Sequence, residues 1–382
     1  MSKKLGEKYL SGQIITYMGN KRKLLDLIGE KIDKIKNELK TDTLTVGDGF
    51  AGSGVVSRLL KTKATKLYTN DIAGYSKTLN ECYLSNPDTK MLQQIQLYIE
   101  EANHLACLSL DNNNSQSPFI SGNWAPSTPE IKLEDRVYFT YENGKRIDII
   151  RNYIETLPFE YRPYLLAPLL VECSIHNNTN GQFSAFYKDS TTNIGSYGGK
   201  GGVDIKRITK EIELPFPLLD DTLSPCQTTI TQMDTNLWAR SLFDKEVDIV
   251  YYDPPYNKHP YAIYYFMLEI INTWDKSIQI PNTNRGQPEE RTKSSYNSYS
   301  KAQEALDDLL TNTNAKYIIL SYNDGGIIPI TELDILLAKH CKELEKIPID
   351  HKTYNRFKGI SNYKRTNDYK PVKEYMYILK KV

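Results

Sequence analysis

Cysteine, histidine and long apolar runs are all scarce in this chain of 382 residues. The five cysteines stand far apart with no Cys-x-x-Cys pair, and the five histidines show no ligand spacing beside them. Neither a disulfide framework nor a structural zinc site is indicated, and we predict no metal ligands. The most apolar stretch, residues 262–271, is short and contains Glu269, and the first residues lack the apolar core of a signal peptide. We therefore expect a cytoplasmic protein without membrane association.

A large excess of charge of one sign is also lacking, because the formal net charge is +1. The charge is unevenly distributed, however: residues 1–40 carry +5, residues 351–382 carry +7, and residues 41–350 carry −11. If the fold brings both ends to one side, they would form a positive face able to follow a phosphate backbone. Two solvated tails would give the same pattern, so charge alone does not decide between these interpretations.

An alternation of strand and helix patterns opens the chain. Apolar residues recur at helical spacing over 28–39, and a strand-like 44–46, a glycine-rich loop at 47–54 and a helical 55–60 follow. A second strand over 66–70 ends at Asp71. This β-α-β start predicts a parallel α/β sheet with ligands at the carboxyl ends of its strands. The pattern resumes late in the chain, with strands expected at 248–252 and 316–321 and a helix at 302–310.

The pattern between residues 85 and 225 is different, being mostly irregular and polar with a helical segment at 164–173. We interpret residues 85–225 as an inserted domain, and residues 1–84 and 226–382 as the domain that holds the sheet. Residues 281–300, rich in Asn, Arg, Ser and Tyr, are expected to form a mobile loop beside the candidate site, although a solvated loop would have the same composition.

The strand-like residues 247–252 end abruptly in Asp253-Pro254-Pro255-Tyr256. These residue types suit the alkylation of an exocyclic amine, whose lone pair is delocalised into the ring unless acceptors localise it on nitrogen. Asp253 would accept one N–H and the Pro254 carbonyl the other, and the prolines would fix that carbonyl because they lock φ near −65°. Tyr256 would stack on the base. A strand followed by a Pro-Pro turn is the simpler alternative.

The glycine loop Phe50-Ala-Gly-Ser-Gly54 lets a ligand lie close to backbone, and Asp71 ends the following strand, where it would hold ribose hydroxyls. A nicotinamide-binding protein would show the same loop. The third glycine of the dinucleotide pattern is replaced by Ser57, however, and S-adenosylmethionine needs no pyrophosphate cradle.

Together these motifs resemble the adenine-specific DNA methyltransferases of the alpha group, the class that includes the Dam enzymes. The resemblance covers about the first eighty residues and those after about 228. Tyr17-Met-Gly-Asn-Lys21 is similar to the aromatic-x-Gly-x-Lys cofactor motif, although Asn20 stands where many members have glycine. The C-terminal residues 356–379 look like the family's closing hairpin. Asp253–Tyr256 resembles the catalytic tetrapeptide, and the cofactor positions implied by the resemblance are Tyr17, Gly19, Lys21, Phe50, Ala51, Gly52, Ser53, Gly54, Asp71, Asp234 and Asp253.

The resemblance implies a Rossmann-like, S-adenosylmethionine-dependent methyltransferase sheet with an inserted target-recognition domain. It implies methyl transfer to the 6-amino group of an adenine flipped out of double-stranded DNA, in a modification enzyme with a cognate restriction endonuclease as a candidate partner. A monomer is expected. Candidate DNA contacts are Lys258, His259, Arg285, Arg356, Lys358, Lys364 and Arg365.

Three alternatives remain open from the sequence. The same chemistry could act on cytosine, on RNA or on a protein glutamine, although related enzymes usually carry Ser or Asn in place of Asp253. A nicotinamide-dependent oxidoreductase would use the glycine loop but would leave residues 17–21 and 253–256 without roles. A DNA-binding module with an inactive catalytic fold would bind cofactor without turnover.

Overall fold

The structure, a computed structural model, describes residues 8–10, 12–111, 118–199, 201–220, 226–258, 260–290, 293–349 and 372–381. The chain divides into two compact units. We call them the sheet unit, which comprises Asn20–Asn80, Thr222–Pro260 and Thr292–Val382, and the helical unit, which comprises Met1–Gly19, Glu81–Asp221 and Tyr261–Arg291.

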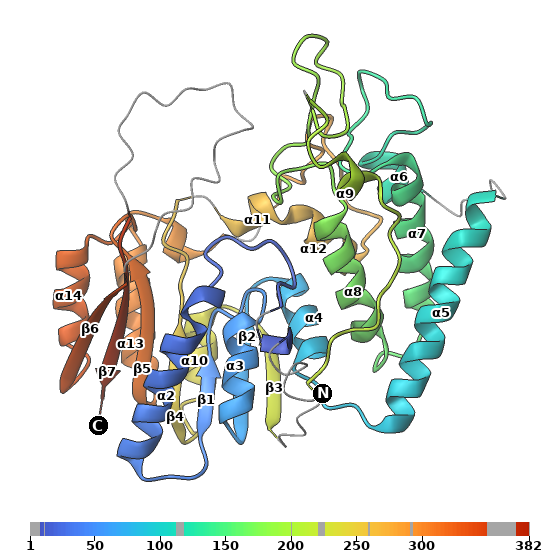
Figure 1. Cartoon of the computed structure of the whole chain (residues 1–382). Coiled ribbons are helices and arrows are strands. Elements are labelled where there is room, and N and C mark those ends of the chain that lie inside the picture. Colours follow the sequence, from blue (N-terminus) through green and yellow to red (C-terminus); the bar gives the residue numbers. More distant parts are fainter. Residues whose placement is uncertain are drawn as a thin grey trace. The chain divides into compact units, whose positions relative to one another are not determined.

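The sheet unit is built on a seven-stranded sheet in the order β3-β2-β1-β4-β5-β7-β6 (Figure 1). The first five strands in this order pair in parallel, whereas β7 pairs antiparallel with both β5 and β6. The strands are β1 (Thr45–Asp48), β2 (Lys66–Asp71), β3 (Gln227–Gln232), β4 (Val247–Tyr252), β5 (Ala315–Asn323), β6 (Glu343–Ile349) and β7 (Glu374–Lys380).

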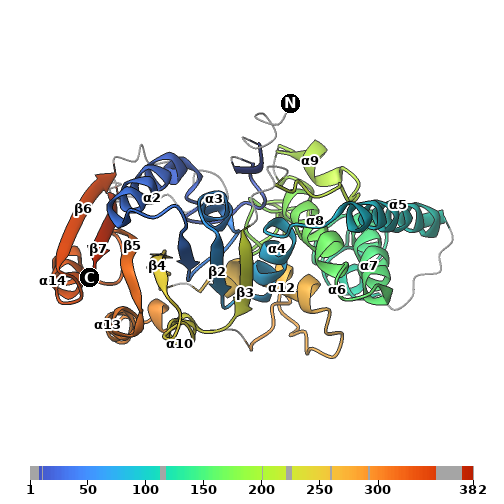
Figure 2. The ribbon, with the colours of Figure 1, turned by 90° about the horizontal axis from the view of Figure 1, so that it is seen from below.

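Helices cover both faces of this sheet. Figure 2 shows α2 and α3 over one face and α10 and α13 over the other. In α2, Ile28, Ile32 and Ile35 are buried at helical spacing, which places an apolar stripe against the strands. The sheet unit's helices are η1 (Arg22–Leu24), α2 (Leu25–Leu39), α3 (Val55–Lys63), α10 (Thr235–Ser241), η2 (Ser295–Asn297), α13 (Ala302–Asn312) and α14 (Ile330–Ala338), while α4 (Gly74–Tyr83) crosses the boundary between the units.

Strand direction determines which residues meet at the carboxyl edge of the sheet. The parallel strands β1, β2, β4 and β5 all end there, so the residues after them share one edge. Because β7 is antiparallel, its first residue, Glu374, lies opposite Asn323 at the end of β5. A residue far along the chain is thereby brought to the edge where ligands bind in such sheets.

The predicted strands at 44–46, 66–70, 248–252 and 316–321 are confirmed as β1, β2, β4 and β5, and the helix at 302–310 is confirmed as α13. The strand expected within 372–379 is β7, which lies inside the sheet between β5 and β6. The preceding residues 356–365 lie outside the described residues. The sequence did not predict β3, whose side chains are mostly polar, or β6, in which apolar residues stand among three charged ones. Neither strand has a fully buried residue.

The helical unit contains more regular structure than the sequence predicted for residues 85–225. The helix expected at 164–173 is confirmed within α8, but the 23-residue α5 and the 16-residue α7 were not predicted. Within the described part of this unit, the helices are α5 (Thr89–Asp111), α6 (Ile120–Asn123), α7 (Tyr141–Thr156), α8 (Arg162–Ile175), α9 (Ile205–Thr209), α11 (Tyr261–Tyr264) and α12 (Phe266–Thr273).

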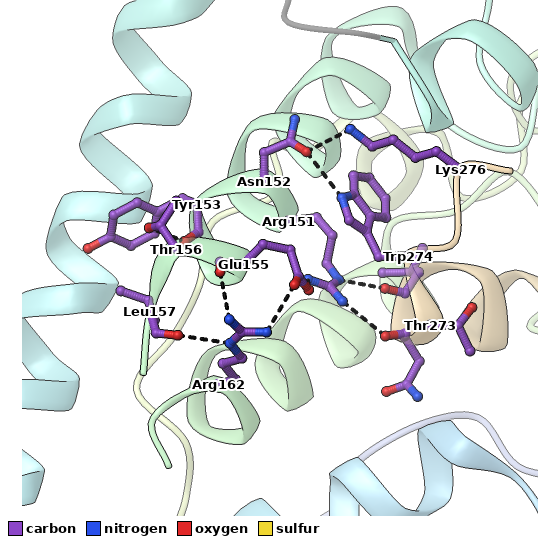
Figure 3. A network of polar contacts seen from close by, with 12 residues as sticks. Arg151, Asn152, Tyr153, Glu155, Thr156, Leu157, Arg162, Thr273, Trp274 and Lys276 are labelled. Carbon is purple, nitrogen blue, oxygen red and sulfur yellow. Dashed lines mark hydrogen bonds and ion pairs between the residues drawn. The ribbon is translucent and has the colours of Figure 1, made fainter. Parts of the chain in front are cut away.

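Buried arginines join these helices. Arg151 on α7 donates to the carbonyl oxygens of Ile271 at 2.7 Å and Asn272 at 3.0 Å, so it caps the C-terminal end of α12 (Figure 3). Its guanidinium also pairs with Glu155, which accepts a second bond from Arg162 at 2.9 Å. A cation near the last carbonyls of a helix offsets their negative partial charge. The network therefore fixes residues 266–273 against α7.

None of the helices in the described residues is long and apolar enough to cross a membrane.

Candidate active site

The glycine loop between β1 and α3 is held from several sides. Ala51 N–H donates to the Asn70 carbonyl at 3.0 Å, and Gly49 N–H donates to the Tyr251 carbonyl at 3.1 Å. Ser76 Oγ donates to the Gly52 carbonyl at 2.6 Å. Gly54 has φ of +75°, a conformation that L side chains rarely adopt, and an added Cβ would lie 2.6 Å from Asn80 Oδ1. The loop is thus fixed in one conformation by its backbone and its neighbours.

Asp71 joins the end of β2 to this loop. Its Oδ2 accepts the Gly52 N–H at 2.8 Å and its Oδ1 accepts the Ala73 N–H at 2.9 Å. Burial raises the pKa of this carboxyl, while the hydrogen bonds from Ala73 and Gly52 oppose that rise. One side chain therefore shapes the loop and presents a carboxylate at the strand end.

Asp48, the last residue of β1, is a second carboxylate at this edge and is 1% exposed. Its Oδ2 accepts a bond from Ser57 Oγ at 2.6 Å, whereas its Oδ1 has no hydrogen-bond partner among the described residues. Burial raises the pKa of Asp48 to about 7. Hydrogen bonds from Ser57 and from the Phe50 N–H oppose the rise, and repulsion from Asp253 and Asp71 adds to it. A buried acceptor without a donor is costly, so this atom is suited to a ligand that donates.

Asp253 follows β4 and forms a cluster with two further charged side chains. Lys21 Nζ lies 3.1 Å from Asp253 Oδ1 and 2.6 Å from Glu374 Oε1, and the Lys21 side chain is only 4% exposed. Burial raises the pKa of Asp253 to about 6, Lys21 opposes that rise and Glu374 adds to it. Burial alone would lower the pKa of Lys21, but attraction by Asp253, Tyr256 and Glu374 holds it well above its usual range. The cluster therefore carries a charged lysine between two carboxyl groups.

The residues after Asp253 are anchored to the end of β5. Ile327 N–H donates to the Tyr256 carbonyl at 3.0 Å, and the Tyr256 ring packs edge-on against Tyr322 with centroids 5.7 Å apart. Lys21 Nζ lies 5.6 Å from the centroid of the Tyr256 ring. Pro254 is buried and Pro255 is half-buried. The predicted tetrapeptide is therefore a fixed turn at the same sheet edge as the glycine loop.

Two other predicted cofactor positions in the sheet unit have clear local contacts. Phe50 is half-buried and packs edge-on against Tyr296 of η2, with ring centroids 5.2 Å apart. Asp234 caps α10, because its Oδ1 accepts the N–H groups of Asn236 at 3.0 Å and Leu237 at 3.2 Å. Its carboxylate thus has a structural task at this helix end.

Tyr17 and Gly19 belong to the helical unit. The Tyr17 ring stacks on Tyr265 with centroids 4.9 Å apart and on Tyr261 with centroids 5.2 Å apart. Met18 N–H donates to the Tyr265 hydroxyl at 2.8 Å, which fixes the backbone between the two predicted positions. Gly19 is exposed and has φ of +71°.

Of the predicted DNA contacts, Lys258 and Arg285 are both exposed side chains. His259, Arg356, Lys358, Lys364 and Arg365 lie outside the described residues. The segment 281–300, predicted to be a loop, is anchored at two places. Arg136 donates to the carbonyls of Pro281 at 3.0 Å and Thr283 at 2.9 Å in the helical unit, and Tyr296 is buried in the sheet unit.

Three residues of the site were missed by sequence reasoning: Asp48, Tyr296 and Glu374. Asp48 ends the strand before the glycine loop, so its position in the sequence could have indicated it. Tyr296 and Glu374 gave no such signal, because only the path of the chain brings them to this edge. Among the described residues, no three His, Cys, Asp or Glu side chains are arranged to hold a metal ion.

Comparison with known proteins shows which methyltransferases this chain is similar to. Residues 17–199 match the family model of D12 class N6 adenine-specific DNA methyltransferases. The chain is 26% identical to the Type II methyltransferase M.NlaIII of Neisseria lactamica over 96% of this chain and 99% of the relative. It is 29% identical to M.CviAII of Paramecium bursaria Chlorella virus 1 over 89% and 92% of the respective chains. In M.FokI of Planomicrobium okeanokoites, at 27% identity, the match covers 96% of this chain but 52% of the relative, so the chain spans about half of that protein.

The family match extends from Tyr17 through the glycine loop into the helical unit, and the matches to the two whole relatives cover 96% and 89% of this chain. It favours adenine in DNA over the other acceptors and over nicotinamide chemistry. The parallel sheet with its glycine loop and fixed Asp-Pro-Pro-Tyr turn agrees with this assignment. Over residues 17–199 the chain is similar to the D12 class of N6 adenine-specific DNA methyltransferases.

Proposed function

We propose that this methyltransferase takes its methyl group from S-adenosylmethionine and transfers it to N6 of an adenine flipped out of duplex DNA, with Asp253 as the acceptor for the amine. The observation that carries the proposal is the fixed position of Asp253. One of its oxygens, Oδ1, is engaged by Lys21 at 3.1 Å, and the turn that follows is bonded to residue 327. A held acceptor costs no reorganisation when charge develops on the amine.

In the proposed mechanism, Asp253 and Pro254 together polarise the amino group of the target adenine. Oδ2 of Asp253 accepts one N–H of the adenine amine and the Pro254 carbonyl accepts the other, which concentrates the lone pair on nitrogen. That lone pair would form the new N–C bond as the bond between the methyl group and the sulfonium sulfur breaks, and S-adenosylhomocysteine would be released. One of the two amine protons would then pass to water. Tyr256 stacks on the base and helps to offset the few kcal/mol, roughly, needed to unstack a base from the duplex.

The charges at the sheet edge support S-adenosylmethionine as the donor. This molecule supplies an activated methyl group on a sulfonium and also carries an ammonium group, so it is cationic at both places. The edge presents the carboxyl groups of Asp48, Asp71 and Asp253, and Asp48 Oδ1 is a buried acceptor without a donor among the described residues. The glycine loop from 50 to 54 would lie against the ligand, and Tyr17, Gly19, Lys21 and Asp234 remain proposed contacts on the strength of the family motif.

We further propose that residues 85–225 recognise the DNA sequence and that residues 1–84 and 226–382 form the catalytic domain. Exchanging residues 85–225 for those of a related enzyme should change the methylated sequence while adenine remains the target. A hybrid that kept the original sequence preference would instead locate specificity in residues 281–300 or in the C-terminal segment.

The relatives' printed names, Type II methyltransferase and modification methylase, favour a role in restriction and modification. We propose this role, with duplex DNA as substrate, a cognate endonuclease as partner, a monomeric state and the expected cytoplasmic location. Light scattering during chromatography tests the monomer, and a dimer mass would contradict it. Deleting the methyltransferase gene tests the endonuclease, because unmodified host DNA would then be cleaved.

The direct test of the proposed chemistry is Asp253→Ala. We expect methyl transfer to fall by at least about 10³-fold, as when a residue that acts in the transition state is removed. Binding of S-adenosylmethionine, measured by calorimetry, should stay within a few fold. Asp248→Ala, on the strand that precedes Asp253 and paired with the exposed Lys316, is the matched control and should keep activity. Equal activity in Asp253→Ala and wild type would refute the assignment.

A further inference from the structure

Glu374 is the residue of the Asp253 cluster that no motif assigned. It is the first residue of β7, and its backbone position is fixed because Lys373 and Asp324 exchange two hydrogen bonds. Asp324 N–H donates to the Lys373 carbonyl at 3.0 Å, and Lys373 N–H donates to Asp324 Oδ1 at 2.9 Å. The side chain is 12% exposed and reaches Lys21 Nζ at 2.6 Å. The shorter of the two ion pairs formed by Lys21 is therefore the one to Glu374.

Building on the proposed function, we propose that Glu374 is a positioning residue for methyl transfer: it holds the Lys21 ammonium against Oδ1 of Asp253, which directs Oδ2 at the target amine. Lysine has a flexible four-carbon stem and a point charge that several acceptors can satisfy. With one carboxylate on each side, the ammonium has a single favoured place. Without Glu374, Lys21 could leave Oδ1 and Asp253 could rotate.

The charge of Glu374 has a second consequence. A lone Lys–Asp pair would be neutral, whereas one ammonium between two carboxylates leaves a net negative charge. Asp253 thus remains a strong acceptor for the amine although Lys21 lies beside it. The other groups that face Asp253 are Tyr256 in the same turn, Tyr251 on β4 and Asp48 on β1. Two carboxyl groups therefore lie near Asp253, those of Asp48 and Glu374, and the carboxyl group of Glu374 is the one that contacts Lys21.

Glu374→Gln tests this role, because it removes the charge and keeps the shape. In single-turnover methylation of unmodified DNA, we expect the plateau rate to fall about ten- to a hundred-fold, as for a misplaced reacting group. The acid limb of the rate profile should move to lower pH, since losing a neighbouring negative charge lowers the pKa of Asp253. Glu374→Asp keeps the charge, so the acid limb of its rate profile should lie at the wild-type pH and part of the lost rate should return. Calorimetric affinity for S-adenosylmethionine should change less than about threefold in both variants.

A double variant shows whether Glu374 acts through Lys21. In a Lys21→Met background, adding Glu374→Gln should cause little further loss of rate, because the shared partner is already absent. The matched control is Glu345→Gln. Glu345 lies on β6 of the same sheet and pairs with two lysines of α2, Lys31 at 3.0 Å and Lys34 at 3.4 Å. This control should leave both the rate and the pH profile unchanged.

Two outcomes would overturn the proposal. One is wild-type rate and pH profile in Glu374→Gln. The other is an equal fall in rate in Glu374→Gln and Glu374→Asp with an unmoved acid limb. That result would mean that Glu374 supports the local fold and does not act on Asp253 through its charge. Detection of 6-methyladenine in DNA treated with the wild-type protein tests the proposed function separately, so that failure of one would not be mistaken for failure of the other.

Discussion

Buried carboxylates in the two units are satisfied to different degrees. In the helical unit, Asp148 on α7 accepts four hydrogen bonds. They come from the N–H groups of Phe119 at 3.1 Å, Ile120 at 2.8 Å and Ser121 at 3.1 Å, and from the Ser121 hydroxyl at 2.6 Å. In the sheet unit, Asp48 accepts one side-chain bond, from Ser57, and its Oδ1 has no partner in the described residues. A saturated carboxylate stabilises the fold, whereas an unsaturated one at a strand end costs stability and suits ligand binding.

The cations of the two units follow the same division. Arg151 donates hydrogen bonds to two carbonyls at the end of α12 and pairs with Glu155, and all of these partners belong to the scaffold. Lys21 lies between Asp253 and Glu374 at the edge where the proposed catalytic turn is held. Burial of a charge therefore does not by itself indicate function. A buried cation indicates a functional site only when its partners lie at a place where a ligand could bind.

The largest effect on stability is expected from Asp148→Ala. It would leave three backbone N–H groups and one hydroxyl without an acceptor, so the free energy of unfolding should fall by about 3 kcal/mol or more. Urea unfolding followed by circular dichroism measures this. Asp148→Asn, which keeps one acceptor oxygen, should fall in between. A loss below about 0.5 kcal/mol in Asp148→Ala would break the comparison, because such small effects are typical of surface positions.

Asp71→Ala should weaken cofactor binding by roughly 1.5–3 kcal/mol, the range for losing hydrogen bonds to a charged acceptor. Part of this loss would come from the glycine loop, since Asp71 also accepts the Gly52 N–H. Calorimetry with S-adenosylmethionine gives the number. Unchanged affinity would mean that the ribose contact lies elsewhere and that Asp71 serves the loop alone.

In contrast to Asp148→Ala, Asp48→Asn should stabilise the protein, raising the free energy of unfolding by roughly 1–3 kcal/mol at pH 8. The pKa of about 7 lies above the ordinary value for Asp, so the ionised carboxylate costs free energy only in the folded state. As the pH falls through 7, the folded protein takes up a proton and the gain should shrink, becoming small near pH 4. Unfolding curves at several pH values check this. A destabilised Asn variant at pH 8 would contradict the account, whereas weaker cofactor binding in that variant would support it.

The smallest effect is expected at Lys258, an exposed residue two positions after Tyr256. If it contacts a phosphate, Lys258→Gln should lower affinity about equally for cognate and non-cognate DNA. The slope of log affinity against log salt should become shallower by about 0.9. Lys316→Gln, exposed but paired with Asp248, is the control. An unchanged slope would remove Lys258 from the DNA-binding surface.

The sequence predicted the sheet and its edge well because local signals coincided there. An apolar strand ending in Asp253-Pro-Pro-Tyr, and a glycine loop followed by a strand ending in Asp71, are features of backbone chemistry that short segments carry. Phe50 to Gly54 and Asp253 to Tyr256 accordingly lie at the ends of adjacent strands, β1 and β4. The edge strand β3 was missed because its polar, partly exposed residues give no apolar alternation.

Glu374 and Tyr296 could not be found in this way, because their positions depend on long-range pairing. Glu374 reaches the site only because β7 runs antiparallel to β5. Tyr296 reaches Phe50 because η2 packs into the core of the sheet unit. The helix α7 was missed for another reason: its polar and charged residues weaken the helical pattern, and its buried charges are satisfied by distant partners. The helix α5 does carry apolar residues at helical spacing, since Ile95, Ile99, Ala102 and Ala106 are all buried, so its pattern could have been found in the sequence.

The central claim is that this chain methylates adenine in DNA through Asp253. Sequencing of DNA with detection of modified bases, from cells that lack other methyltransferases and express either the wild type or Asp253→Ala, tests it most directly. We expect 6-methyladenine at one short sequence motif in the wild-type sample and none above background in the variant, with both proteins present in equal amounts. Methylated adenine at the same motif in both samples, or methylation of another base by the wild type, would contradict the account.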